Sequence, residues 1–513
     1  MQEIIGGRHG PVASVRVAGR RGRRAPRPYD GLMSGWRLEH TYAKLPPLFY
    51  TPVEPTPVRD PHYVVFNVPL ALELGLDVEA LESDDGVAIF SGNRLPDGAF
   101  PIAQAYAGHQ FGTFTALGDG RAILLGEQVA PDGRRVDIQL KGAGQTRYSR
   151  RGDGRAALGP MLRELVIGEA MHALGIPTTR GLAVVATGEP VYRERVQQGA
   201  VLTRVASSHL RVGTVQWAAA HRDIDALRAI VGYTIDRHYP TLRDAERPAL
   251  ALLDAVAERQ AVLIAKWQLV GFVHGVMNTD NMSLAGETID YGPCAFIDVY
   301  DPATVFSSID MQGRYAFGNQ PAIAEWNLAR FAEALLPLID PDGERALDLA
   351  RASLERFARL YERAWLDGMR AKLGLFTAED DDRALVDDLL AWMTAAKADF
   401  TWTFVELSRD GADAMRRADP SFGPWLERWR ARLARQPRDA REVTSLMRRH
   451  NPIVVPRNHR VEEALSAAEQ GSIAPLGALL DALRDPYDYT RPRPELSNPP
   501  PPADVPYRTF CGT

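Results

Sequence analysis

The sequence predicts an α+β protein with two lobes, a small N-terminal lobe built on an antiparallel sheet and a large, mostly helical C-terminal lobe. Three observations lead to this prediction. The chain has 513 residues, which is enough to bury more than one core. Residues 122–129 and 136–141 have the pattern of strands, and the turn residues Pro-Asp-Gly at 131–133 between them are typical of a hairpin. From residue 222 onward, apolar residues recur at helical spacing over long stretches.

The chain divides into four predicted parts. They are a disordered extension (1–35), a strap followed by the small lobe (36–220), the helical lobe (221–485) and a Pro-rich tail (486–513). The first part is rich in Gly and Arg and poor in apolar residues, so we expect it to be disordered or to precede a true start at Met33. A basic binding arm or an Arg-rich targeting peptide is the alternative, and the apolar stretch of a secretory signal is missing. We expect the fold to begin near Trp36.

Composition excludes several classes of protein. Hydrophobic residues make up 45% and charged residues 24% of the chain, as in ordinary globular proteins. A net charge of −5 gives no nucleic-acid signature, and no apolar run is long enough to span a membrane. The only cysteines, Cys294 and Cys511, cannot build a disulfide framework, a structural zinc site or an iron–sulfur cluster. We therefore expect a monomer in the bacterial cytoplasm, or in the mitochondrion if the chain is eukaryotic.

The N-terminal part opens with extended and glycine-rich segments. Residues 46–63 are Pro-rich and predict a strap, and residues 64–81 have helical spacing. A stretch at 105–121 follows, with glycines at 108, 112, 118 and 120. Such glycines let backbone approach a ligand closely, and clustered N–H groups can hold phosphate, although most loops of this kind only turn the chain. The hairpin after this stretch ends in Lys141.

Apolar spacing predicts a helix at 160–174 that carries Glu164. A strand lysine paired with a helix glutamate holds the α- and β-phosphates of ATP in protein kinases, so Glu164 is the candidate partner of Lys141. Two exposed and unrelated side chains are the alternative. The loop 142–155 between them is either solvated or a second phosphate-handling segment, with Asp153 and Gly154 touching nucleotide.

Arginines follow on the next predicted strands, 181–186 and 200–205. Arg204 and then Arg211 offer guanidinium groups that suit phosphate oxygens, although surface ion pairing is the default for any single arginine. Helices are predicted at 222–235 and 248–269.

The most informative stretch is 271–293. Protein kinases use a His-x-Asp loop, an Asn five residues after that Asp, and an Asp-x-Gly metal ligand. Counted from His274, the Asn falls on Asn281, and Asp290 begins an Asp-Tyr-Gly sequence. The position of the usual catalytic Asp is Val276, so Asp280 is the only carboxylate in the loop. Both metal ligands are therefore present without the ordinary kinase base.

The C-terminal part reads as an activation-type segment followed by helices. The segment is 302–318, the predicted helices are 325–339, 343–372, 384–399, 461–470 and 474–483, and a polar loop occupies 451–460.

Taken together, these motifs resemble the selenoprotein O (YdiU) family of protein nucleotidyltransferases with a pseudokinase fold. The matching stretches are 118–121, 139–142, 151–154, 175–180, 274–282 and 290–293, with a cysteine third from the end. The resemblance runs from about Trp36 to Thr513 and implies a two-lobed, protein-kinase-like fold with nucleotide-binding loops in the small lobe.

The resemblance also implies an activity and site residues. The expected reaction is transfer of AMP from ATP, or of UMP from UTP, to Ser, Thr or Tyr hydroxyls of protein substrates, with Mg²⁺ or Mn²⁺. Asp280 would accept the proton of the hydroxyl, Asn281 and Asp290 would hold the metal, and Glu164 would orient Lys141. The residues implied to contact nucleotide are Gly118, Gly120, Arg121, Lys141, Asp153, Gly154, Arg204, Arg211 and Asp290.

Alternatives stay open at this point. Cys511 stands where eukaryotic members carry selenocysteine, and a reversible Cys294–Cys511 disulfide is one hypothesis, with two separate thiols as the other. For the whole protein, the competing functions are an atypical kinase that transfers the γ-phosphate and a non-catalytic pseudokinase that only binds nucleotide. The lost base at Val276 argues against the first, and the full metal and phosphate set argues against the second.

Overall fold

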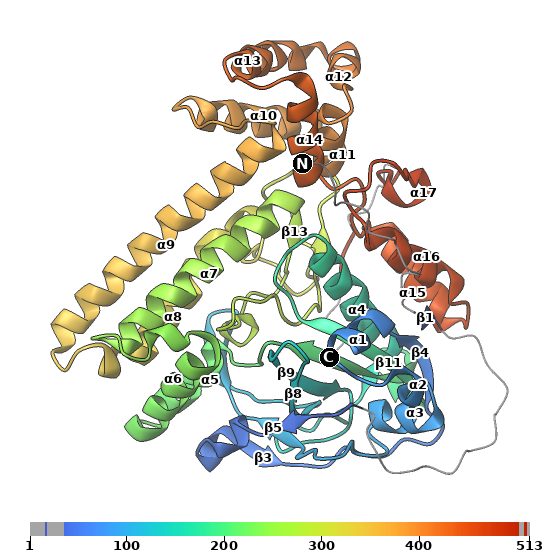
Figure 1. Ribbon diagram of the computed structural model, residues 1–513, viewed down its shortest axis with the longest axis vertical. Coiled ribbons are helices and arrows are strands. Elements are labelled where there is room, and N and C mark those ends of the chain that lie inside the picture. Colours follow the sequence, from blue (N-terminus) through green and yellow to red (C-terminus); the bar gives the residue numbers. More distant parts are fainter. Residues whose placement is uncertain (1–15, 18–34, 502–506, 510–513) are drawn as a thin grey trace, which may run out of the picture.

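A computed structural model of the chain describes residues 16–17, 35–501 and 507–509 (Figure 1). Its N-terminal half is organised around an antiparallel sheet in the strand order β1-β4-β11-β12-β9-β8-β5-β3, with β10 on β12 and β2 on β8. The strands are β1 (Arg16–Val17), β2 (Leu38–Glu39), β3 (Tyr50–Pro52), β4 (His62–Phe66), β5 (Ile102–Gln104), β8 (Ala122–Val129), β9 (Arg135–Lys141), β10 (Ala156–Ala157), β11 (Arg180–Tyr192) and β12 (Val196–Ala206). A separate hairpin consists of β6 (Ala107–Gln110) and β7 (Thr113–Ala116).

Side chains of β11 alternate between two cores, one on each face of the sheet. Val184 and Ala186 belong to a core with helix α4 (Leu158–Ala173), whereas Ala183 and Val185 pack with the short helices α1 (Val68–Glu73), α2 (Val78–Leu81) and α3 (Asp84–Ser91). The sheet is therefore covered on both faces, and α4 is the helix on the face that carries the site.

The register of β9 and β12 brings two cations together. Arg204 on β12 pairs with Gln139 on β9, and Lys141 lies two residues beyond Gln139. Because side chains two residues apart point to the same face of a strand, Arg204 and Lys141 share one face of the sheet.

The helical half is built on the long helix α7. The helices before the last part of the chain are α5 (Val212–Ala220), α6 (Ile224–His238), α7 (Pro248–Val270), α8 (Gln320–Ile339) and α9 (Gly343–Lys372). Helix α7 packs against both α8 and α9, and the three run side by side in Figure 1. The remaining helices are α10 (Asp382–Ala396), α11 (Phe400–Leu407), α12 (Ala412–Ala418), α13 (Gly423–Ala434), α14 (Ala440–His450), α15 (Asn458–Glu469), α16 (Ala474–Leu483) and α17 (Pro494–Ser497). In the described ranges, none of these helices has both the length and the apolar character needed to cross a membrane.

Helix α7 ends at Gly271, whose φ of +75° is the left-handed conformation that commonly closes a helix. The chain then enters β13 (Phe272–Val273), which pairs with β14 (Ala295–Phe296). This two-stranded ribbon closes the loop 274–294 at its base. The loop carries Asp280, Asn281 and Asp290.

The predicted α+β class is confirmed as a mixed fold with an antiparallel sheet and many helices. Several predicted elements need correction. Residues 62–66, expected as strap and helix, form strand β4, because Val64, Val65 and Phe66 are buried and the strand pairs with β11. Helix α1 starts only after Asn67, whose side chain accepts a hydrogen bond from the backbone N–H of Leu70.

The extension 1–35 lies mostly outside the described residues. Its residues 16 and 17 do form a strand on β4, and the chain is described continuously from Gly35.

Candidate active site

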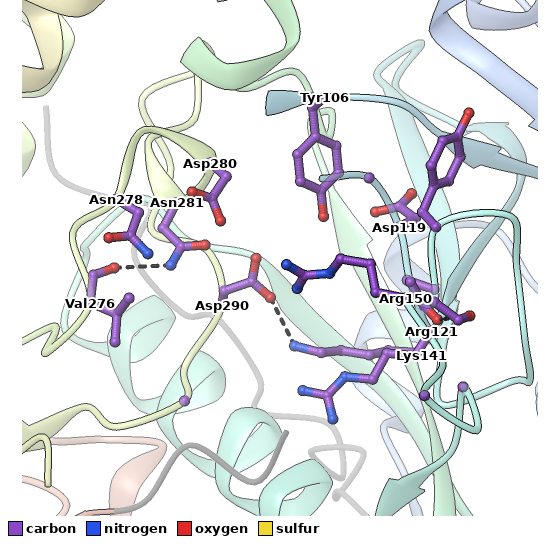
Figure 2. A pocket seen from close by; sticks show the side chains of 18 of the residues that line it. Tyr106, Asp119, Arg121, Lys141, Arg150, Val276, Asn278, Asp280, Asn281 and Asp290 are labelled. Atoms are coloured by element: carbon purple, nitrogen blue, oxygen red, sulfur yellow. Dashed lines mark hydrogen bonds and ion pairs between the residues drawn. The ribbon is translucent and has the colours of Figure 1, made fainter. Parts of the chain in front are cut away.

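One cavity of about 320 Å³ lies between the sheet and the loop 274–294 (Figure 2). Eleven residues singled out in the sequence line it: Gly118, Gly120, Arg121, Lys141, Asp153, Gly154, Arg204, Arg211, Asp280, Asn281 and Asp290. Figure 2 shows Arg121, Lys141 and Arg150 entering from one side and Asp280, Asn281 and Asp290 from the other. The fold thus brings basic groups and oxygen ligands, far apart in sequence, to face each other.

Asp290 is held by three cations. Its Oδ1 accepts hydrogen bonds from Lys141 Nζ at 2.8 Å and Arg204 Nη2 at 2.5 Å, and its Oδ2 accepts one from Arg211 Nη1 at 2.9 Å. Burial alone would raise the pKa of this carboxyl, but Arg204, Lys141 and Arg211 outweigh it and hold the pKa well below its usual range. Asp290 is therefore an anion, and it has a left-handed φ of +64°.

Glu164 on α4 binds two of the same cations, Lys141 and Arg204. It is buried and accepts hydrogen bonds from Lys141 Nζ at 2.7 Å and Arg204 Nε at 2.6 Å. Burial raises the pKa of its carboxyl, and Arg204 and Lys141 overcome this effect and lower the pKa below its ordinary value. The carboxylates of Glu164 and Asp290 thus fix Lys141 and Arg204 between them.

Asp280 has a different environment. It lies on the short 3₁₀ turn Thr279–Asn281, is 8% exposed, and its Oδ1 has no hydrogen-bond partner among the described residues. Burial raises the pKa of its carboxyl to about 6, and Arg211 opposes that shift. Such a pKa suits a group that accepts a proton near neutral pH.

Two glycines leave room for Asp280. A Cβ on Gly108 would lie 2.1 Å from Asp280 Oδ1, and one on Gly213 would lie 1.9 Å from the carbonyl oxygen of Ala107. Strand β6 can therefore approach the Asp280 carboxylate, and helix α5 can approach strand β6, only because these positions are glycine.

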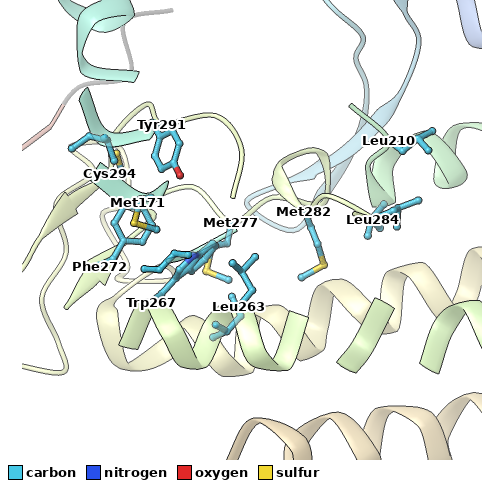
Figure 3. Packing of buried hydrophobic residues seen from close by; sticks show 14 of the residues in the cluster. Met171, Leu210, Leu263, Trp267, Phe272, Met277, Met282, Leu284, Tyr291 and Cys294 are labelled. Carbon is cyan, nitrogen blue, oxygen red and sulfur yellow. The ribbon is translucent and has the colours of Figure 1, made fainter. Parts of the chain in front are cut away.

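The buried side chains of the loop hold it on helix α7. Met277, Met282 and Leu284 belong to the main core, and Figure 3 shows Met277 and Met282 beside α7, near Leu263 and Trp267. These apolar residues face the helix while the polar residues between them face the cavity, which explains why this irregular segment is well anchored.

Asn281 and Asp290 carry oxygen atoms of the kind that a divalent cation such as Mg²⁺ takes as ligands. The Asn281 amide nitrogen donates to the carbonyl oxygen of Val276 at 2.9 Å, which orients the amide and leaves its oxygen for a ligand. In the described part of the chain, no group of three or more His, Cys, Asp or Glu could hold a metal on its own. A cation with only two protein oxygens here would complete its shell with phosphate oxygens and water, as Mg²⁺ does at nucleotide sites.

His274 and Val276, the other positions of the kinase-type motif, have structural roles here. His274 is buried, its Nε2 lies 2.9 Å from the carbonyl oxygen of Ile289, and its ring stacks on Trp267. Val276 lines the cavity with an apolar side chain and supplies only its carbonyl oxygen to Asn281.

The glycine-rich loops pack on one another. A Cβ on Gly118 would lie 2.4 Å from the Tyr148 ring, and one on Gly154 would lie 2.1 Å from the Gly144 backbone. Ser149 Oγ donates to the carbonyl oxygen of Gly120 at 2.5 Å. From the sequence, these glycines are expected to let backbone approach a ligand. In the structure, the contact of Gly118 with Tyr148 of the loop 142–155 already requires a glycine, and the close approach of Gly154 to Gly144 within that loop requires another.

Sequence reasoning singled out the stretches 105–121 and 142–155 but not their individual cavity residues, and it missed Arg193 altogether. The cavity residues in those stretches are Tyr106, Asp119, Tyr148, Arg150 and Arg155. Asp119 is buried, accepts from Gln139 Nε2 at 3.2 Å and lies 3.8 Å from Arg211. Because Asp119 stands between Gly118 and Gly120, the sequence could have indicated that it lies at the site. Arg193 lies in the turn between β11 and β12, and its guanidinium nitrogens donate to the Asp153 carboxylate at 2.8 and 2.9 Å. No sequence motif points to Arg193, because only the folded hairpin brings it to Asp153.

Cys294 is buried, and burial raises the pKa of its thiol to about 12. Cys511 lies outside the described residues, so the proposed disulfide does as well. The nearby tail residue Thr509 does contact this region, since its Oγ1 donates to the carbonyl oxygen of Pro293 at 2.7 Å.

Comparison with known proteins identifies the family to which this chain is similar. Residues 34–484 match the family described as "Protein adenylyltransferase SelO". A protein of Geobacillus kaustophilus named "Protein nucleotidyltransferase YdiU" is 59% identical over 482 residues, covering 94% of this chain and 100% of the relative. Proteins of the same name from Anoxybacillus flavithermus and Syntrophotalea carbinolica are 58% and 57% identical, covering 94% and 93% of this chain and 100% and 98% of the relatives. The chain therefore belongs to the SelO family of protein nucleotidyltransferases.

Proposed function

We propose that this protein transfers AMP from ATP, or UMP from UTP, to Ser, Thr or Tyr hydroxyls of protein substrates and releases pyrophosphate. The observation that carries the proposal is the contrast between two carboxyls of one cavity. Asp290 is an anion fixed by three cations, whereas Asp280 has a pKa of about 6 and an oxygen to which no described residue donates a hydrogen bond. Paired carboxyls with separated pKa values are typical of divided catalytic roles.

The residues suggest how the reaction runs. Asp280 Oδ1 accepts the proton as the hydroxyl oxygen of the acceptor forms a bond to the α-phosphorus. The bond from the α-phosphorus to the bridging oxygen breaks, and that oxygen leaves with pyrophosphate. Lys141, Arg204 and Arg211 would neutralise charge on the phosphates. A Mg²⁺ or Mn²⁺ ion on Asn281 and Asp290 would supply further charge neutralisation at the phosphate oxygens.

The proposal includes a protein-kinase-like, two-lobed architecture. It is supported by Lys141 at the end of a sheet strand, its ion pair with Glu164 on the covering helix, and the Asn and Asp of the loop opposite. The replacement of the usual base by Val276 supports transfer of a nucleotidyl group over transfer of the γ-phosphate. The printed names of the relatives support the same reaction class.

The decisive experiment uses ATP labelled at either the α- or the γ-phosphate, with Mg²⁺ or Mn²⁺ and a mixture of cellular proteins. We expect only the α-label to enter protein. Entry of the γ-label would identify a kinase, and nucleotide binding without entry of either label would identify a non-catalytic pseudokinase.

Asp280→Ala should lower the rate of transfer about 1,000-fold while leaving ATP binding intact, because the base contributes on that order. Glu287→Gln is a matched control. Glu287 is half-buried and burial raises its pKa to about 7, but it accepts hydrogen bonds from Ser207 and does not line the cavity. Full activity in Asp280→Ala would exclude Asp280 as the base.

A further inference from the structure

The β6–β7 hairpin ends in an unusual turn. Gln110 pairs with Thr113, so Phe111 and Gly112 form a two-residue loop with φ values of +50° and +89°. Both positive values are typical of a type I′ turn, whose first position favours Asn, Asp or Gly. A bulky side chain is strained in this conformation, and such strain is often found where a residue has a function. Phe111 is 39% exposed, so its ring is only partly buried.

This hairpin is attached directly to the loop that carries Asp280. The backbone N–H of His109 donates to Thr279 Oγ1 at 2.8 Å, and that of Phe111 donates to Asn278 Oδ1 at 3.1 Å. Tyr315, from the segment 302–318, donates its hydroxyl to the same Asn278 oxygen at 2.6 Å. Asn278 therefore joins the hairpin and the segment at a point two residues before the proposed base.

Around this junction the two segments expose apolar side chains. Phe114 is 45% exposed, Ile309 55% and Met311 85%. The ring of Phe111 lies 5.1 Å from that of Tyr315, so the hairpin tip and the segment are in contact. Exposed apolar groups on adjoining segments next to a reactive site are a common feature of protein-binding surfaces.

The same segment carries a cation that lacks a counter-charge in the described part of the chain. The Arg314 guanidinium lies 4.8 Å from the Trp326 ring, and among the described residues no carboxylate pairs with it. Its Nε is buried and has no hydrogen-bond partner there. Arg330, 4.9 Å from the same ring, by contrast pairs with Glu333. Arg314 is thus a half-buried cation whose charge no carboxylate of the described residues neutralises.

We infer that the hairpin tip (Phe111, Phe114) and the segment around Arg314 (Ile309, Met311) form a docking surface for the polypeptide that carries the acceptor hydroxyl. The bound segment is extended, places an apolar side chain against Phe111 and places an acidic side chain on Arg314. The apolar patch, the unpaired charge and the direct attachment to the Asp280 loop favour this occupant over a small molecule. The inference rests on the proposed nucleotidyl transfer.

The test uses a peptide library with one central Ser, Thr or Tyr, degenerate flanking positions and α-labelled ATP. We expect labelled peptides to be enriched in an apolar residue and an acidic residue at fixed distances from the hydroxyl. Phe111→Asn keeps a residue that favours the left-handed turn but removes the ring, and it should raise KM for such a peptide about tenfold without raising KM for ATP. Arg314→Glu should change the acidic preference to a basic one.

Phe376→Asn is the matched control, because Phe376 is 37% exposed and contacts Arg438, far in sequence from both segments. It should leave both KM values unchanged. Unchanged peptide KM in Phe111→Asn, unselective labelling of the library, or labelling of whole proteins with no peptide labelled would each overturn the docking surface. If the α-label enters neither peptides nor proteins, the proposed function itself is wrong.

Discussion

At the scale of single residues, the environment of Asp280 sets the pH at which it can work. Burial raises the pKa of its carboxyl to about 6, so the carboxyl is protonated below that pH and unable to accept a proton. We expect kcat to rise as the pH increases through about 6 and to level off above it, in a profile measured with α-labelled ATP. Glu287→Gln should show the same profile. A rate that is flat across this range would argue against Asp280 as the base.

Glu164 is a second residue whose environment predicts a measurable effect. It is buried and bonded to two buried cations, Lys141 and Arg204, so Glu164→Gln would remove the charge that balances them. Breaking a buried pair in this way costs about 3 kcal/mol of stability. The melting temperature should therefore fall clearly, and the affinity for ATP should weaken because Lys141 loses one of its two anchors.

The control for this variant is Glu463→Gln. Glu463 pairs with Arg460 at the surface and is 58% exposed, so its loss should change the free energy of unfolding by less than about 1 kcal/mol. Equal melting temperatures for the two variants would show that the buried pair does not contribute as described.

At the scale of secondary-structure elements, strand β6 limits the position of the loop 274–294. Gly108 lies against the Asp280 carboxylate, and a Cβ there would come within 2.1 Å of Oδ1. Gly108→Ala should displace the carboxylate and lower kcat about 100-fold, since a shift of about 1 Å in a reacting group has an effect of that order. ATP binding, measured by calorimetry, should persist.

Gly232→Ala provides the comparison, because Gly232 lies within helix α6 and a Cβ added there would meet no described atom within 4 Å outside its own helix backbone and chain neighbours. That substitution should leave kcat unchanged and slightly raise stability, as alanine favours helices. Wild-type kcat in Gly108→Ala would mean that Asp280 is not held where the structure places it.

Elements with strong local signals were predicted closely. Helices α9 and α16 have the predicted bounds, because their apolar spacing is regular and Asp342 caps the start of α9 through the N–H groups of Glu344 and Arg345. Strand β4 was missed because the sequence Val64–Phe66 is equally compatible with a helix, and its partner β11 lies far along the chain. The β6–β7 hairpin was hidden in a glycine-rich stretch expected to be a loop.

At the scale of the whole molecule, motif residues could be predicted to share a site, but their arrangement could not. Lys141 and Asp290 are 149 residues apart and meet only because the sheet and the loop 274–294 face one another. The Arg193–Asp153 pair and the junction at Asn278 depend on tertiary contacts that leave no periodic pattern in the sequence. The kinase-like arrangement of the two lobes stays a prediction.

The contact made by Thr509 restricts how another chain can reach the cavity. Its N–H donates to the carbonyl oxygen of Phe306 at 2.8 Å, and its own carbonyl oxygen accepts from the N–H of Ser308 at 2.9 Å. These backbone groups are the ones an incoming strand would need in order to add alongside residues 306–308. The protein therefore already occupies these groups with its own backbone, and a visiting polypeptide cannot add a strand at this position while Thr509 is in place.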